Sequence, residues 1–253
     1  MKPSNDIALE FHERTKMLPA NESQGLEARP TTEERPKPLA GFALSPVRAS
    51  AGGLSLETSI ERRYTSRLFD NSRPLSAALL ARLLRFSCGY TSITLQEDGS
   101  GQFMEHRAQP SAGATYPINT FFIASNLSRL PPGVYRYDAR VHTAVWLRQG
   151  RFDRQIAKWT LEQPWLARAA VHFLLTGCYE RIQGRYAARG YRYMLFEAGH
   201  IAQNLSLLGA AYGLAVQAVG GFEDETLARL LRLPPGEEVL YLLSAGHRRR
   251  EPS

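Results

Sequence analysis

Apolar side chains recur at the spacing of an α-helix in several separate stretches of this chain. Between residues 76 and 86, four leucines fall on one face, which predicts a helix that packs against a core. Ser76 stands directly before them and suits an N-cap, because its hydroxyl can accept a backbone N–H. The longest helical pattern covers 186–212 and ends at Gly213. Shorter helices are expected at 6–17, 152–161 and 224–231.

Short apolar runs bounded by turn residues predict strands between these helices. They lie at 120–124, 133–137, 143–147, 169–177, 214–219 and 239–245. Residues 138–140 join two of them as a hairpin, whereas the polar stretch 91–105 is expected to be an exposed loop. Strands that are grouped, with helices between them, favour an α+β sandwich over a dinucleotide-binding fold. No GxGxxG sequence follows a predicted strand, so the fingerprint of an NAD site is absent.

The chain divides into an N-terminal arm and one compact domain. Residues 19–53 are rich in Pro, Glu, Arg, Ser and Gly, which predicts an extended or poorly ordered segment lying across the main body. With the first helix this segment forms the arm, 1–53. Residues 54–253 form the compact domain, which is long enough to bury a sizeable core.

The net charge and the distribution of basic residues indicate which classes of ligand the protein can bind. The formal charge is +7, and 27 of the 31 basic residues are arginines. The arginines are spread along the chain, with one dense run at 248–250, and no nucleic-acid-binding motif accompanies them. We therefore expect no nucleic-acid partner. Arginine suits planar contacts with phosphate or carboxylate, so a phosphate-bearing cofactor or an acidic peptide fits the charge, although codon usage in a GC-rich genome explains it equally well.

Two cysteines, Cys88 and Cys178, are too few and too far apart for a disulfide framework or a metal site, and the six histidines show no ligand spacing. We expect no bound metal. No apolar run approaches the roughly 20 residues of a membrane helix, and the first residues lack the apolar core of a signal peptide. A cytoplasmic location without membrane contact is the expectation.

Three segments carry candidate chemistry. Residues 110–117 read PSAGATYP, a turn of small residues that leads into a buried strand and can bring backbone close to a flat ligand. Residues 62–69 place three arginines and two hydroxyls within six positions, and 218–222 read AVGGF after a predicted helix and strand. Each segment alone also fits an ordinary turn or a solvated helix end.

The three segments, in this order, resemble the FMN-dependent nitroreductase superfamily. The sequence PSAGATYP is similar, more narrowly, to that of the SagB-type dehydrogenases, which oxidise azolines to azoles in modified peptides. The resemblance runs from about residue 56 to 247 and touches the first helix at 8–16. It implies a nitroreductase-like α/β sandwich with a central, mainly antiparallel sheet, and a homodimer with FMN bound between its subunits.

The resemblance also implies roles for individual residues around FMN. Arg63 and Thr65 would bind the phosphate, and Arg67 would lie near N1 and O2 of the ring, where a cation stabilises the reduced flavin. Arg248 or its neighbour Arg249, near the C-terminal end, would complete the phosphate site. The remaining cofactor contacts would come from Ser111, Gly113 and Ala114 at the ring edge and from Gly220 and Gly221 near N5 and O4.

Arg185 and Tyr186 are the candidate catalytic residues. SagB-type enzymes usually have Lys-Tyr at this place, and the pair is thought to handle the substrate proton; here the lysine is replaced. Guanidinium stays charged and does not act as a base, so Tyr186 is the candidate for proton transfer. Alternatively, Arg185 only holds an anionic substrate in a different flavin reaction. If 181–193 is helical, Arg181, Arg185, Arg189 and Arg192 form one cationic stripe, which equally fits a solvated surface.

The following helix, 197–204, combines small residues with polar ones, and the resemblance makes it a dimer interface. We interpret His200 and Asn204 there as structural. The prediction is an FMN-dependent oxidoreductase whose substrate is a heterocycle in a peptide, or another small molecule, with oxygen reoxidising the flavin. The alternatives are a flavin oxidase or reductase of another natural-product intermediate, an NAD(P)H-dependent nitro or quinone reductase, and a basic binding module without activity.

Overall fold

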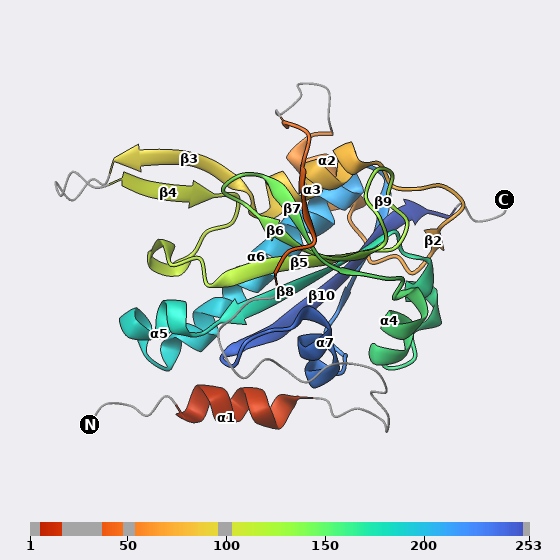
Figure 1. Cartoon of the computed structure of the whole chain (residues 1–253). Helices are drawn as coiled ribbons and strands as arrows, with labels where there is room; N and C mark the ends of the chain where they lie inside the picture. Colours follow the sequence, from red (N-terminus) through yellow and green to blue (C-terminus); the bar gives the residue numbers. More distant parts are fainter. Residues whose placement is uncertain (1–5, 17–36, 48–53, 96–102, 250–253) are drawn as a thin grey trace.

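A computed structural model describes residues 6–16, 37–47, 54–95 and 103–249. Its centre is an eight-stranded sheet in which every strand pairing is antiparallel, in the order β1-β7-β6-β5-β8-β10-β2, with β9 also paired to β10 (Figure 1). In chain order the strands are β1 (Ala40–Ala43), β2 (Phe69–Asp70), β5 (Ile118–Ala124), β6 (Gly133–Asp138), β7 (Thr143–Gln149), β8 (Val171–Cys178), β9 (Leu214–Val219) and β10 (Glu237–Arg248).

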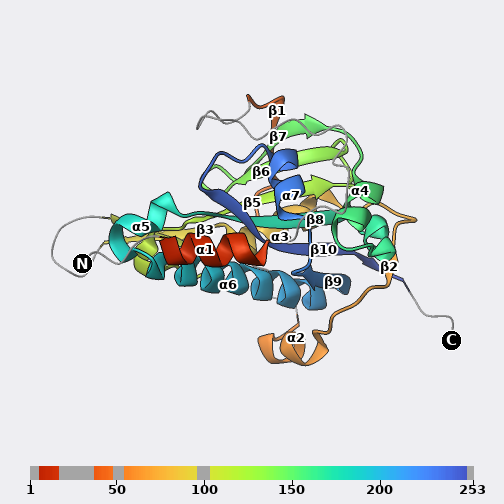
Figure 2. The same cartoon turned by 90° about the horizontal axis from the view of Figure 1, so that it is seen from below.

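Helices cover both faces of this sheet (Figure 2). They are α1 (Asp6–Thr15), α2 (Leu56–Arg62), α3 (Ala77–Cys88), α4 (Asp153–Trp159), α5 (Glu180–Tyr186), α6 (Arg189–Ala211) and α7 (Asp224–Leu231). Phe122 of β5 packs into a core with α3 and α6, whereas its neighbours Phe121 and Ile123 pack into a second core with α4 and α7. This alternation is the period of a strand, so the central strands are apolar on both faces. The predicted α+β sandwich with a mainly antiparallel sheet is confirmed.

Two predicted elements are corrected. The stretch 91–105, expected to be a loop, instead contains most of a hairpin of β3 (Tyr90–Leu95) and β4 (Phe103–Arg107), and its polar centre, 96–102, lies outside the described residues. The helix expected over 186–212 is broken, because Ala187 has a φ of 47° and separates α5 from α6. The four arginines of 181–192 therefore do not form one helical stripe.

The N-terminal arm contributes to the compact part at two places. Strand β1 pairs with β7 and forms one edge of the sheet, and α1 packs beside α6 (Figure 2). The extended segment predicted at 19–53 lies outside the described residues except at 37–47. The domain boundary at residue 53 stays a prediction. Among the described helices, none is long and apolar enough to cross a membrane.

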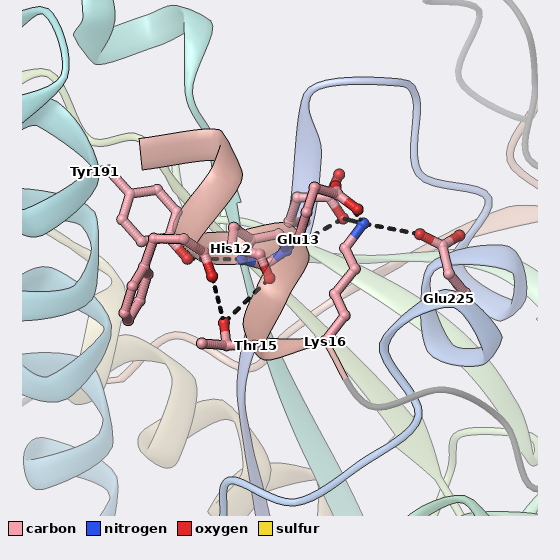
Figure 3. A network of polar contacts seen from close by, with 8 residues as sticks. His12, Glu13, Thr15, Lys16, Tyr191 and Glu225 are labelled. Atoms are coloured by element: carbon pink, nitrogen blue, oxygen red, sulfur yellow. Dashed lines mark hydrogen bonds and ion pairs between the residues drawn. The ribbon is translucent and has the colours of Figure 1, made fainter. Parts of the chain in front are cut away.

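Polar side chains hold α1 in place (Figure 3). His12 is buried and its Nδ1 lies 2.6 Å from the hydroxyl of Tyr191, at the start of α6. Lys16 donates to Glu13 and Glu225 at 2.8 and 2.9 Å and lies 3.6 Å from Glu238. Burial lowers the pKa of Lys16, but these hydrogen bonds and carboxylates more than offset it and raise the pKa above its ordinary value. The ammonium is therefore charged at neutral pH.

Replacing Lys16 with methionine is expected to lower the free energy of unfolding by about 1–3 kcal/mol, because partly buried carboxylates lose their partner. Urea unfolding of the variant and the wild type measures this difference. Lys158→Met is the matched control, since Lys158 is exposed on α4 and should change stability little. Equal losses in the two variants would show that the Lys16 contacts do not hold α1.

Candidate functional site

Two arginine-bearing cavities contain most of the predicted site residues. The first, of about 270 Å³, lies where α2 ends. Ser55 caps the start of α2 by accepting the backbone N–H of Thr58, and the chain turns extended at Arg63. The helix end thus places 62–65 over the second half of α6. Basic and hydroxyl groups on the wall come from Arg62, Arg63, Tyr64, Thr65, Ser206, Tyr241 and Arg248.

Arg248 approaches this cavity from the last strand. It pairs with Phe69 of β2, and its guanidinium carbon lies 4.3 Å from the centre of the Tyr64 ring. The Nε atom of Arg248 is buried and has no hydrogen-bond partner among the described residues. Among the residues that the structure describes, no carboxylate lines the cavity. Three arginines, hydroxyls and an unpaired buried donor form a set that fits a phosphate group, so these residues fit the FMN phosphate.

The rest of the wall offers a small, smooth surface. It consists of small and apolar residues of α6 and β9 with one amide, namely Gly199, Ala202, Gln203, Ala210, Leu214, Val216 and Ala218. The sequence analysis did not assign any of these to the cofactor. Their signal was the recurrence of small residues in the helix of 197–204, which we interpreted as part of a dimer interface.

Three predicted cofactor residues, Arg67, Gly220 and Gly221, line neither of the two cavities. Arg67 is exposed and its guanidinium carbon lies 4.8 Å from the ring of Trp165. Gly220 and Gly221 follow β9, two and three residues after the cavity residue Ala218. A Cβ on Gly220 would meet no atom within 4 Å, so its backbone is open to a ligand. The two glycines therefore follow the cavity wall closely in the sequence, whereas the Arg67 guanidinium lies over Trp165.

The second cavity, of about 830 Å³, is built around the turn of 110–117. Gly113 has a φ of 57°, and Ala114 and Tyr116 also have positive φ values, of 52° and 44°. Side-chain contacts hold this unusual backbone. The hydroxyl of Ser111 accepts the N–H of Tyr116 at 2.9 Å, and the Tyr116 hydroxyl donates to the carbonyl of Glu105 at 3.0 Å. Ser111 thus supports the turn from within.

Arg185 and Tyr186 both lie against Gly113. Nη1 of Arg185 donates to the carbonyl of Gly113 at 3.2 Å. A Cβ on Gly113 would stand 2.7 Å from both Arg185 Nη1 and the Tyr186 hydroxyl, so only glycine permits this approach. The Tyr186 ring is half-buried and packs edge-on against Tyr193, with centroids 5.0 Å apart. The structure therefore brings the candidate catalytic pair to the predicted turn.

Glu197 is a site residue whose burial the sequence analysis missed. The sequence analysis described 197–204 only as a helix of small and polar residues, but Glu197 is just 2% exposed and its Oε1 accepts a hydrogen bond from Nε2 of Gln109 at 3.1 Å. Burial raises the pKa of its carboxyl, while contacts with Ser111 and Gln109 oppose that rise. His200 is exposed on the same helix, and Asn204 donates to the carbonyl of Ser87, a structural contact.

The two cavities lie apart in one chain. They share no lining residue. The turn and α5 lie at one end of the molecule, and α2 and the C-terminal end of β10 lie toward the other (Figure 1). We call the first cavity, with Arg63 and Arg248, the phosphate-side cavity. Helix α6 begins shortly after Arg185, and about 20 Å of this helix separate its start from Ala202 in the phosphate-side cavity. Within one chain, the predicted site residues therefore lie in two separate groups.

Comparison with known proteins gives the same assignment as the predicted motifs. Residues 60–247 match the Nitroreductase family. A putative nitroreductase of Methanocaldococcus jannaschii is 30% identical over 195 residues, which cover 77% of this chain and 92% of that protein. The microcin B17-processing protein McbC of Escherichia coli is 27% identical over 137 residues, 50% of this chain and 48% of that protein.

A solved structure, the Escherichia coli microcin synthetase McbBCD complex with truncated pro-MccB17 bound, contains a chain with the same fold. Its TM-score is 0.64 at 20% sequence identity, and the match covers 97% of this chain and 93% of that chain. Within the described residues, no group of three or more His, Cys, Asp or Glu side chains is placed to hold a metal ion.

Proposed function

The chain belongs to the nitroreductase family of oxidoreductases, and we propose that it is an FMN-dependent dehydrogenase that oxidises an azoline ring within a peptide to an azole. One observation carries the proposal: Tyr186 and Arg185 both face Gly113 of the PSAGATYP turn, and Gly113 and Arg185 line a cavity of about 830 Å³ that can admit a peptide segment. The similarity to a microcin-processing protein supports the same substrate class.

Oxidation of an azoline to an azole removes one proton and one hydride from the ring. FMN, when bound, supplies the hydride acceptor, and molecular oxygen takes the two electrons afterwards. The proton needs an acceptor on the chain. Tyr186 would accept this proton in its phenolate form and become the neutral hydroxyl, whereas the Arg185 guanidinium stays charged and orients the site through the Gly113 carbonyl.

Arg63, Thr65 and Arg248 would hold the FMN phosphate, and Gly220 and Gly221 at the end of β9 would approach the ring. Because the cavity of Ser111, Gly113 and Ala114 lies apart from the phosphate-side cavity, we propose that the two groups meet across a homodimer interface. Exposed apolar side chains lie on α2, on the turn after it and on α6, three of the segments that contribute to the phosphate-side cavity, and this supports the arrangement. They are Leu56, Ile60 and Tyr64 of α2 with its following turn, and Leu195 and Phe196 of α6.

A second function, reduction of nitro or quinone compounds by NAD(P)H, is favoured by one observation: the 30% identical archaeal protein is named a putative nitroreductase and is covered over 92% of its length. The two functions differ in the source of electrons. Incubation with a synthetic thiazoline peptide under oxygen, without NAD(P)H, should remove two hydrogen atoms from the peptide, as measured by mass spectrometry. Turnover only with NAD(P)H and a nitro or quinone acceptor would contradict the dehydrogenase.

The dimer gives a prediction of its own. Purified protein should show flavin absorbance with about one FMN per chain and the mass of a dimer by light scattering. Phe196→Glu, which places a charge on the 55% exposed ring position of α6, should yield monomers that lose FMN. Val141→Glu, at an exposed apolar position in the turn between β6 and β7, is the matched control and should stay dimeric. A monomer that retains FMN would contradict the shared site.

A further inference from the structure

A third cavity, of about 410 Å³, lies beside the cavity of the PSAGATYP turn. The two cavities share the side chains of Arg107 and Tyr116 as part of their walls, together with Glu105 and Ala114. The rest of the lining comes from the end of α3, Thr115 of the turn, strands β5 and β6, the two residues after β6 and the start of α5. A group bound in this cavity would therefore lie one wall away from Tyr186 and Arg185.

The charge of this cavity is mostly positive. Four arginines line it, Arg107, Arg136, Arg140 and Arg181, against the two carboxylates Glu105 and Asp138. Both carboxylates are engaged by the exposed Arg140: its Nη2 lies 3.3 Å from Glu105 Oε2, and its backbone N–H donates to Asp138 Oδ1 at 3.1 Å. Neither carboxylate lies within ion-pair distance of Arg107 or Arg181.

Hydrogen bonds to neutral groups hold the Arg181 guanidinium in position. Its Nη1 donates to Oδ1 of Asn119 at 2.9 Å and to the carbonyl of Tyr116 at 3.3 Å. Asn119 is itself fixed, since its Nδ2 donates to Glu237 Oε1 at 2.6 Å. Both contacts of the guanidinium use the same nitrogen, and among the described residues no hydrogen bond uses Nε or Nη2. The Arg181 guanidinium is thus held in a fixed orientation, and its other N–H groups can donate to a ligand.

Arg107 is the second positioned cation. Its guanidinium carbon lies 4.6 Å from the centre of the Tyr116 ring, and its backbone N–H donates to the Tyr116 hydroxyl at 3.1 Å. The Nε atom is buried and lacks a hydrogen-bond partner among the described residues. An unpaired buried donor costs free energy, and a bound anionic oxygen would satisfy it.

We propose that this cavity binds the carboxylate of an acidic residue in the substrate peptide, a few positions from the ring that is oxidised. Two oriented guanidinium groups match a carboxylate, whose two oxygens can accept in parallel. The shared wall of Arg107 and Tyr116 connects this subsite to the cavity lined by Gly113 and Arg185. The identification of the ligand as part of a peptide rests on the proposed function; the preference for a carboxylate rests on the cavity alone.

Binding to the FMN-loaded protein tests the carboxylate preference without turnover. The probes are two blocked pentapeptides of four glycines around a central residue, which is glutamate in one and glutamine in the other. Calorimetry at low salt should show the glutamate peptide binding at least 10-fold more tightly, with a preference that shrinks as salt screens the charges. Equal affinities for the two peptides would overturn the proposal.

Variants test which arginine produces the preference for the glutamate peptide. Arg181→Gln should reduce the preference for glutamate to below about 3-fold, and Arg181→Lys should restore part of it, because lysine keeps the charge but not the planar pair of donors. Arg151→Gln is the control, since Arg151 is an exposed arginine paired with Asp153 outside this cavity. A preference that survives Arg181→Gln would overturn the site. A preference that is lost in this variant, in a protein that does not oxidise thiazoline peptides, would contradict the proposed function and leave the site standing.

Discussion

Arg63→Ala is expected to yield a folded protein that binds FMN about 10–100-fold more weakly than the wild type. A hydrogen bond to a charged group contributes about 1.5–3 kcal/mol, and about 1.4 kcal/mol corresponds to tenfold in affinity. Arg63 is exposed where α2 ends; its backbone N–H donates to Ile60, and its side chain makes no hydrogen bond within the described part of the chain. Removing the side chain therefore changes the cavity and leaves the helix end intact.

Titration of the apoprotein with FMN, followed by flavin fluorescence, measures the loss. Arg248→Ala should weaken binding by a similar factor, because Arg248 reaches the same cavity from β10 with an unpaired buried Nε. Arg63→Lys should recover part of the affinity. Arg151→Ala removes an exposed arginine elsewhere and should bind FMN normally. Unchanged FMN affinity in both Arg63→Ala and Arg248→Ala would mean that the phosphate binds elsewhere.

Local signals in the sequence were sufficient for most of the sandwich. The helix predicted from four leucines begins where Ser76 indicated, and the Ser76 hydroxyl accepts the N–H of Leu79 at 3.1 Å. The hairpin of β6 and β7 and the buried strands β5 and β8 also lie where the apolar runs placed them. Such signals act within a few residues, so they are visible without the rest of the fold.

Elements stabilised by distant contacts were not predictable. The break between α5 and α6 depends on packing across the turn: the Tyr179 hydroxyl donates to the Ala187 carbonyl at 3.0 Å, and Gly190 lies against Ile182, where a Cβ would stand 2.9 Å away. The hairpin of β3 and β4 has mostly exposed side chains in β3, so its residues lack the alternation that predicts a half-buried strand.

The grouping of the site residues follows the same rule. The motifs are short stretches of sequence that can be recognised by themselves. Which motif lies in which cavity, however, depends on how the sheet and α6 arrange them in space. Arg67 illustrates this: it is only four residues from Arg63, yet its guanidinium lies over Trp165, which is contributed by a segment about a hundred positions away in the sequence. The burial of Glu197 was also not predictable. In the sequence it stands among polar residues of the helix, but tertiary packing buries it.

Tyr186→Phe is expected to lower turnover of a thiazoline peptide by about 10²–10⁴-fold while FMN stays bound, the range for loss of a general base. Phenylalanine can keep the edge-on contact with Tyr193 and removes only the hydroxyl that faces Gly113. Stopped-flow reduction of the flavin by the peptide measures the chemical step directly. Tyr193→Phe, which removes a hydroxyl from the neighbouring ring, is the matched control and should retain most of the rate.

Arg185→Lys separates proton transfer from orientation at the same site. Lysine is the residue that SagB-type enzymes usually carry at this position, so the variant should keep the activity or raise it. Arg185→Ala should lower activity, because the contact between the guanidinium and the Gly113 carbonyl is lost. If Tyr186→Phe oxidises the peptide at the wild-type rate, another group accepts the proton. The azoline dehydrogenase would then lack the base on which it depends, and reduction of another substrate would become the better account of this cavity.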